Sequence, residues 1–137
     1  MTPILAFDIE TIPDVNGIRL LYDLPADLPD NEVILFAQQQ RRAKTGSDFM
    51  QHHLHQVVAI SCCMRWGQDK IRVSTIGDPE DSEEVMIAKF FEVIENYTPQ
   101  LVSWNGGGFD LPVLHYRALI HGISAARYWD MGDGDFG

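Results

Sequence analysis

Two acidic residues near the start of the chain could bind a divalent metal ion. Asp8 and Glu10 lie in the short apolar segment 4–11, which is predicted to be a strand. Because side chains alternate between the faces of a strand, both carboxylates point one way while Phe7 and Ile9 point the other. Two negative charges this close stay ionised when a cation lies between them, and carboxylate oxygens favour Mg²⁺ or Mn²⁺. The alternative is that both residues are solvated at the end of the strand.

The segment 103–110, Ser-Trp-Asn-Gly-Gly-Gly-Phe-Asp, is the second candidate for chemistry. Its three consecutive glycines, between an expected strand and an expected helix, allow a sharp turn or a close approach of the backbone to a ligand. Asp110 either joins Asp8 and Glu10 as a third metal carboxylate or caps the helix that follows. Asn105 is a candidate hydrogen-bond donor to a substrate.

Two aromatic residues of the same segment have two interpretations each. Trp104 and Phe109 can stack on the terminal bases of a nucleic-acid strand, as aromatic side chains do in proteins that bind single strands. They can also pack into the hydrophobic core, and for Trp104 core packing is the interpretation that we favour.

The segments that must position these side chains alternate between strands and helices. The run 57–64 is almost continuously apolar and rich in β-branched residues, which predicts a central strand covered on both faces. A hairpin turn at 67–69 predicts an antiparallel pair of strands, while helical crossovers predict parallel pairs. This order predicts an α/β fold with a mixed β-sheet flanked by helices. The predicted strands span 4–11, 55–66, 70–76 and 100–104, the predicted helices span 32–44, 81–98 and 111–121, and a loop with one helical turn spans 18–31.

Composition and charge limit the class of protein. The chain has 137 residues, which predicts a single domain over 1–137. Its formal net charge of -10 at pH 7 argues against nucleic-acid binding through a broad basic surface. It does not argue against an enzyme that binds the end of a nucleic-acid strand through metal ions. The chain has no apolar run long enough to span a membrane, no evident signal peptide, and two adjacent cysteines that cannot form an ordinary disulfide with each other. We therefore expect a cytoplasmic protein.

Together, the two acidic segments resemble the motifs of the DnaQ-like, or DEDD, 3'-5' exonucleases, which have a ribonuclease H-like fold. The first family motif, D-x-E at the end of the first strand, matches Phe7-Asp8-Ile9-Glu10-Thr11, and the second, N-x-x-x-F-D before a helix, matches 105–110. The segment 53–61 further resembles predicted exonucleases related to the proofreading domain of family B DNA polymerases. The resemblance covers almost the whole chain, and two motifs together are more specific than D-x-E alone.

The resemblance implies a metal-dependent 3'-5' exonuclease that hydrolyses phosphodiester bonds from the 3' end of single-stranded DNA or RNA. Asp8, Glu10 and Asp110 would hold two ions, Mg²⁺ or Mn²⁺, with Asp8 bridging both. Such ions lower the pKa of the attacking water and neutralise the charge that develops on the phosphate. The residues implied to contact the substrate are Thr11, Asn105 and Phe109.

The third motif of the family, a C-terminal Asp with a Tyr or His on a later helix, has no match in this chain. Asp130, Asp133 and Asp135 lie in a glycine-rich tail without a helical pattern, and Tyr128 precedes them by too few residues. We therefore expect the chain to be the C-terminally truncated, N-terminal part of an exonuclease domain, and to be catalytically deficient by itself.

Two other functions fit parts of the sequence. An aspartate-nucleophile phosphatase carries a D-x-D-x-T motif that residues 8–11 imitate with Glu10 in place of the second Asp, but this function leaves the segment 105–110 unexplained. A non-catalytic ribonuclease H-like scaffold that binds nucleic acid or a partner is compatible with the missing third motif. Metal-dependent loss of nucleotides from a 3' end distinguishes the exonuclease from both.

Overall fold

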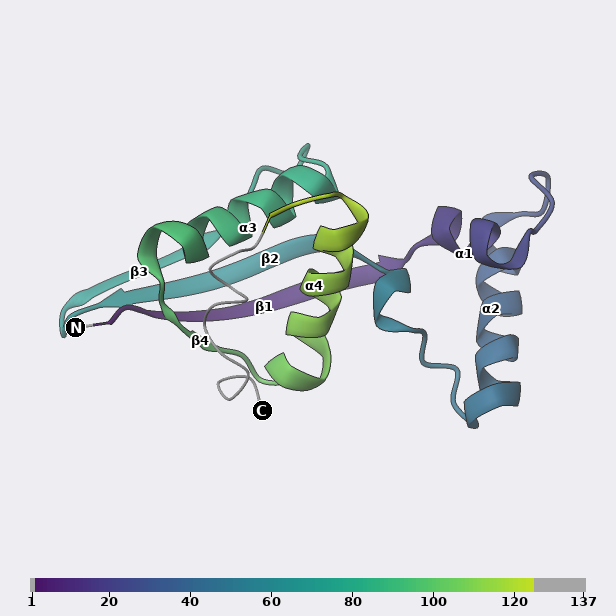
Figure 1. Ribbon diagram of the computed structural model, residues 1–137, viewed down its shortest axis with the longest axis horizontal. Helices are drawn as coiled ribbons and strands as arrows, with labels where there is room; N and C mark the ends of the chain where they lie inside the picture. Colours follow the sequence, from purple (N-terminus) through teal and green to yellow (C-terminus); the bar gives the residue numbers. More distant parts are fainter. Residues whose placement is uncertain (1, 125–137) are drawn as a thin grey trace. The chain divides into compact units, whose positions relative to one another are not determined.

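The computed structural model describes residues 2–124 (Figure 1), and these form two compact units. The sheet unit contains residues 2–11 and 57–124, and the helical unit contains residues 12–56. The expectation that 1–137 acts as one domain stays a prediction. The strands are β1 (Ile4–Pro13), β2 (His55–Trp66), β3 (Lys70–Thr75) and β4 (Gln100–Val102), and the helices are α1 (Val15–Tyr22), α2 (Asp30–Thr45), α3 (Glu83–Tyr97) and α4 (Leu111–Ile120).

Within residues 2–124, the sheet has four strands in the order β3-β2-β1-β4. β1 and β4 run parallel, with Ile4 opposite Gln100, while β2 and β3 form an antiparallel hairpin in which Cys63 lies opposite Val73. The predicted α/β class and the predicted mixed sheet are confirmed. β1 and β4 are parallel neighbours and β4 ends at Val102, opposite Ala6, so the segment after β4 begins beside the part of β1 that carries Asp8.

The main core lies between one face of this sheet and the two helices α3 and α4 (Figure 1). Phe90 of α3 is completely buried, and its ring centroid lies 5.1 Å from that of Phe7 on β1 and 5.3 Å from that of Phe91. The buried residues that these elements contribute include Leu5, Phe7, Ile9, Val57, Ile60, Met64, Met86, Ile87, Phe90, Phe91, Ile94, Leu111, Val113 and Leu114.

The prediction that the strand 57–64 is covered on both faces is wrong for the part of the chain that the structure describes. Val58 is 42% exposed and Ser61 is exposed, whereas Ile60 and Met64 are buried against the helices. The physical reason is that α3 and α4 both contribute to the core on the same face of the sheet. An apolar run alone does not distinguish a strand covered on both faces from one covered on a single face.

The helical unit contains α1 and α2 around a small core of its own, made of Ile18, Val33, Ala37, Met50 and Leu54. The predicted helix over 32–44 is confirmed as α2, but the predicted loop over 18–31 begins with the last part of α1. Asp14 starts α1, because its side chain accepts a hydrogen bond from the Gly17 backbone N–H at 3.1 Å. A Cβ at residue 17 would lie 2.6 Å from Asp14 Oδ2, so this cap requires glycine there.

Candidate metal site

The structure places Asp8 and Glu10 on the exposed side of β1. Their neighbours Phe7 and Ile9 are each 6% exposed and belong to the main core, while both carboxylates are exposed to solvent. The alternation therefore follows the strand pattern: the core fixes the strand through Phe7 and Ile9, and the opposite side chains are free to bind a ligand. Thr11 follows on the same strand and is partly buried.

Asp110 lies at the start of α4 and is only 4% exposed. Its carboxylate does not cap α4, because its Oδ2 instead accepts a hydrogen bond from the Ser103 hydroxyl at 2.6 Å. Burial raises the pKa of Asp110, the negative charge of Asp8 raises this pKa further, and the Ser103 hydrogen bond lowers it. The charged form of Asp110 is thus disfavoured by its surroundings, and groups with a perturbed pKa are frequent at functional sites.

The three predicted carboxylates have the right chemistry for a hard divalent cation, but they are not drawn together into one cluster. Asp8 and Asp110 are near enough to interact electrostatically. Among residues 2–124, however, no three His, Cys, Asp or Glu side chains are grouped closely enough to hold a metal ion. Carboxylates repel one another when no cation lies between them.

The glycine segment forms a single π-helical turn, Gly106–Asp110, that carries the chain from β4 into α4. The backbone N–H of Phe109 donates to the Asn105 carbonyl at 2.9 Å. A Cβ at residue 108 would lie 2.7 Å from the Asn105 side-chain oxygen, so glycine at this position leaves room for the Asn105 amide. The turn brings the backbone of the exposed Asn105 next to that of the buried Asp110, whose N–H donates to the Asn105 carbonyl at 3.4 Å.

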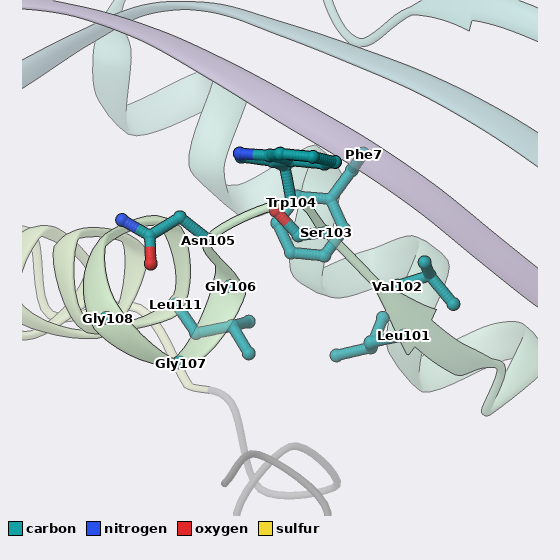
Figure 2. Close-up of a pocket in the computed structure, with 10 residues that line it drawn as sticks. All are labelled: Phe7, Leu101, Val102, Ser103, Trp104, Asn105, Gly106, Gly107, Gly108 and Leu111. Atoms are coloured by element: carbon teal, nitrogen blue, oxygen red, sulfur yellow. The ribbon is translucent and has the colours of Figure 1, made fainter.

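A groove of about 670 Å³ opens beside this turn (Figure 2). Its lining includes Phe7, Leu101, Ser103, Trp104, Asn105 and the three glycines. Trp104 is fully exposed, so the interpretation that it packs in the core is wrong. Phe109 is partly buried and packs against the main core. The exposed indole ring and the polar Asn105 give the groove the two kinds of group that bind an unpaired base.

Ser103 is the residue of this site to which sequence reasoning assigned no role. Its contact with Asp110 depends on how the turn folds back between β4 and α4, and a serine at the end of a strand carries no signal for it. The acidic residues Asp130, Asp133 and Asp135, considered for the third motif together with Tyr128, lie outside the described residues. Within residues 2–124, no helix is long and apolar enough to cross a membrane.

Comparisons with known proteins bear on the fold and the family of the chain. The chain is 46% identical over 39 residues to DNA polymerase 1 of Sulfolobus acidocaldarius, a match that spans 28% of this chain and 4% of that protein. Its fold is similar to that of the family B DNA polymerase from Pyrobaculum calidifontis, with a TM-score of 0.52 and 19% identity over 91% of this chain and 12% of the polymerase chain. The fold is accordingly a ribonuclease H-like α/β fold. Residues 47–136, more than half of the chain, match the model of predicted 3'-5' exonucleases related to the exonuclease domain of PolB, and the chain belongs to this family.

Proposed function

We propose that this chain carries the metal-binding part of a 3'-5' exonuclease that removes nucleotides from the 3' end of single-stranded DNA by a two-metal mechanism. The observation that carries the proposal is that Asp8, on β1, lies near Asp110, at the start of the helix that follows the parallel neighbouring strand β4. The exposed Asp8 lies near enough to raise the pKa of the buried Asp110, and Glu10 lies on the same side of β1 as Asp8. Repulsion of this kind is relieved when a cation binds between the carboxylates.

In this mechanism the carboxylates of Asp8, Glu10 and Asp110 hold Mg²⁺ or Mn²⁺, which when bound activates water and stabilises the charge that develops on the phosphate. Ser103 keeps one oxygen of Asp110 in place through its hydrogen bond, which leaves the other oxygen for a cation. Asn105 donates hydrogen bonds to the terminal nucleotide, and Trp104 offers a ring on which its base stacks.

The remaining predicted contacts belong to the same proposal. Thr11, one residue after Glu10 in β1, and Phe109, in the turn before α4, are the further substrate contacts of this proposal. The net charge of -10 gives the surface little affinity for phosphates, so we expect the metal ions to supply most of the attraction for the strand end. Binding is then expected to depend weakly on salt and strongly on the divalent metal.

The test is the product ladder from a 5'-labelled single-stranded DNA in Mn²⁺ or EDTA. The proteins compared are this chain and the product of its gene read to the natural stop codon, each as wild type, Asp8→Asn and Asp69→Asn. Asp69 is an exposed residue in the β2–β3 turn and serves as a matched control. Shortening from the 3' end that requires Mn²⁺, is lost with Asp8→Asn and is kept with Asp69→Asn supports the proposal. If neither protein shortens DNA or RNA while nucleic acid still binds, the chain is a non-catalytic scaffold.

A further inference from the structure

The sheet unit contains a second buried group of charges, which the proposed metal site does not use. Glu83 and Arg117 are 7% and 4% exposed, and with Asp110 they are the buried polar or charged residues of the part of the chain that the structure describes. A charged pair is expensive to remove from water, and apolar side chains of similar volume often stabilise a core as well or better. The pair therefore calls for an explanation other than stability.

Glu83 joins three elements through its two carboxylate oxygens. Arg117 donates to Oε1 from Nη2 at 2.6 Å and from Nε at 3.0 Å, and Nε also lies 3.0 Å from Oε2. The Val57 backbone N–H donates to Oε2 at 2.6 Å, and His121 Nε2 lies 2.7 Å from Oε1. Glu83 begins α3, Val57 lies near the start of β2, and Arg117 is in the last turns of α4. Figure 1 shows the C-terminal end of α4 beside the N-terminal end of α3.

The position of Arg117 relates this contact to the metal site. Arg117 follows Asp110 by seven residues, about two turns of helix, so both side chains lie on the same face of α4. A rotation of α4 by one residue, about 100°, would therefore turn Asp110 away from Asp8 and separate Arg117 from Glu83 at once. Apolar contacts of α4 are not directional, whereas a two-pronged arginine–carboxylate contact fixes the angle of the helix.

We propose that Glu83 and Arg117 are positioning residues that fix the rotation of α4, so that Asp110 faces Asp8. They act at one end of α4, while the Ser103 hydrogen bond holds Asp110 at the other end. The inference rests on the proposed metal site for its functional meaning, but the position of Asp110 can be measured without a metal.

The test compares an apolar pair, Glu83→Leu with Arg117→Met, with wild type and with the single variant Arg117→Met. Lys89→Met is the matched control, because it breaks the ion pair of Lys89 with Asp81, which lies at 2.8 Å and is more exposed. The apolar pair keeps the core filled but leaves the Val57 N–H without its acceptor, so its melting temperature is expected to stay close to that of wild type. Arg117→Met alone leaves the buried Glu83 carboxylate without its arginine and is expected to melt earlier.

Two readouts then separate positioning from stability. In the metal-free apolar-pair variant, the backbone amide NMR signals of Ser103 and Asp110 are expected to shift, while those of β3 stay in place, and Lys89→Met is expected to leave the Ser103 and Asp110 signals unchanged. The Mn²⁺ dissociation constant of the apolar pair is expected to be about tenfold or more above that of wild type. Arg117→Lys keeps the charge without the two-pronged contact, so its dissociation constant is expected to lie between those of wild type and the apolar pair.

Unchanged Ser103 and Asp110 signals in a folded apolar-pair variant overturn the positioning role, whatever the metal does. If wild type itself does not bind Mn²⁺, the proposed metal site fails, but the amide signals still decide whether the pair fixes α4.

Discussion

Replacing Asp110 by asparagine is expected to stabilise the metal-free protein at neutral pH. The carboxylate is 4% exposed and experiences the negative charge of Asp8, and both effects raise its pKa. Asparagine has the same shape and keeps an oxygen that can accept the 2.6 Å hydrogen bond from Ser103. The substitution therefore removes an unfavourable charge and leaves the packing in place.

The size of the effect follows from two opposing contributions. Removing a carboxylate from water costs several kcal/mol, of which a hydrogen bond to the charged group returns about 1.5–3 kcal/mol. Repulsion from Asp8 adds to the cost. We expect a net gain of about 1 kcal/mol for Asp110→Asn, or about 3–5 °C in melting temperature for a chain of this size.

The dependence on pH gives the sign of the effect. Because the pKa of Asp110 is raised by folding, protonation of its carboxyl favours the folded state. This contribution is fully present below the ordinary pKa of Asp, about 3.9, and is lost as the pH rises through the raised pKa. Asparagine does not titrate, so Asp110→Asn does not lose stability in this way as the pH rises. The difference in melting temperature between the variant and wild type is therefore expected to be near zero at low pH and to grow toward neutral pH.

The assay is thermal unfolding of wild type and Asp110→Asn in EDTA across this pH range, with Asp69→Asn as the exposed control. Added Mn²⁺ is expected to raise the melting temperature of wild type and not that of Asp110→Asn, because a ligand stabilises the state that binds it. The reasoning is refuted if the variant melts below wild type at neutral pH, or if the difference is the same at every pH.

Three further substitutions test separate features of the site and the core. Ser103→Ala is expected to raise the pKa of Asp110 further, so that Mn²⁺ binding requires a higher pH. A titration with Mn²⁺ at several pH values should show this change for Ser103→Ala and binding as in wild type for Ser103→Thr, which keeps the hydroxyl. Trp104→Ala is expected to change the free energy of unfolding by less than about 0.5 kcal/mol but to weaken binding of a single-stranded oligonucleotide by about 1–3 kcal/mol, measured by fluorescence anisotropy; Trp104→Phe should bind nearly as wild type. Phe90→Ala is expected to lower the free energy of unfolding by about 3–5 kcal/mol in urea, because the ring is fully buried against Phe7; a loss below about 1 kcal/mol would contradict its central place in the core.

Local patterns were enough to predict most of the elements and the exposed part of the site. The alternation along β1 depends only on strand geometry, so residue types and their spacing suffice to separate Asp8 and Glu10 from the buried Phe7 and Ile9. The bounds predicted for β2, 55–66, are those of the structure, because the apolar, β-branched run and the turn that follows it are both local signals. The functional roles of Asp8 and Glu10 remain predictions.

What could not be predicted depends on contacts between distant segments. Ser103 and Asp110 are brought together across the π-helical glycine turn, and Trp104 is exposed in the segment between β4 and that turn; neither follows from residue type. Glu83 and Arg117 are 34 residues apart, and a charged residue at a helix start normally indicates a solvated cap rather than a buried pair.

The most direct test of the central claim, that these carboxylates form one metal site, is an electron paramagnetic resonance titration of free Mn²⁺ with wild type, Asp8→Asn, Glu10→Gln and Asp69→Asn. We predict that wild type and Asp69→Asn bind the ion alike, and that each substitution in β1 weakens binding about tenfold or more, equivalent to about 1.4 kcal/mol. Equal Mn²⁺ binding by all four proteins would contradict the claim.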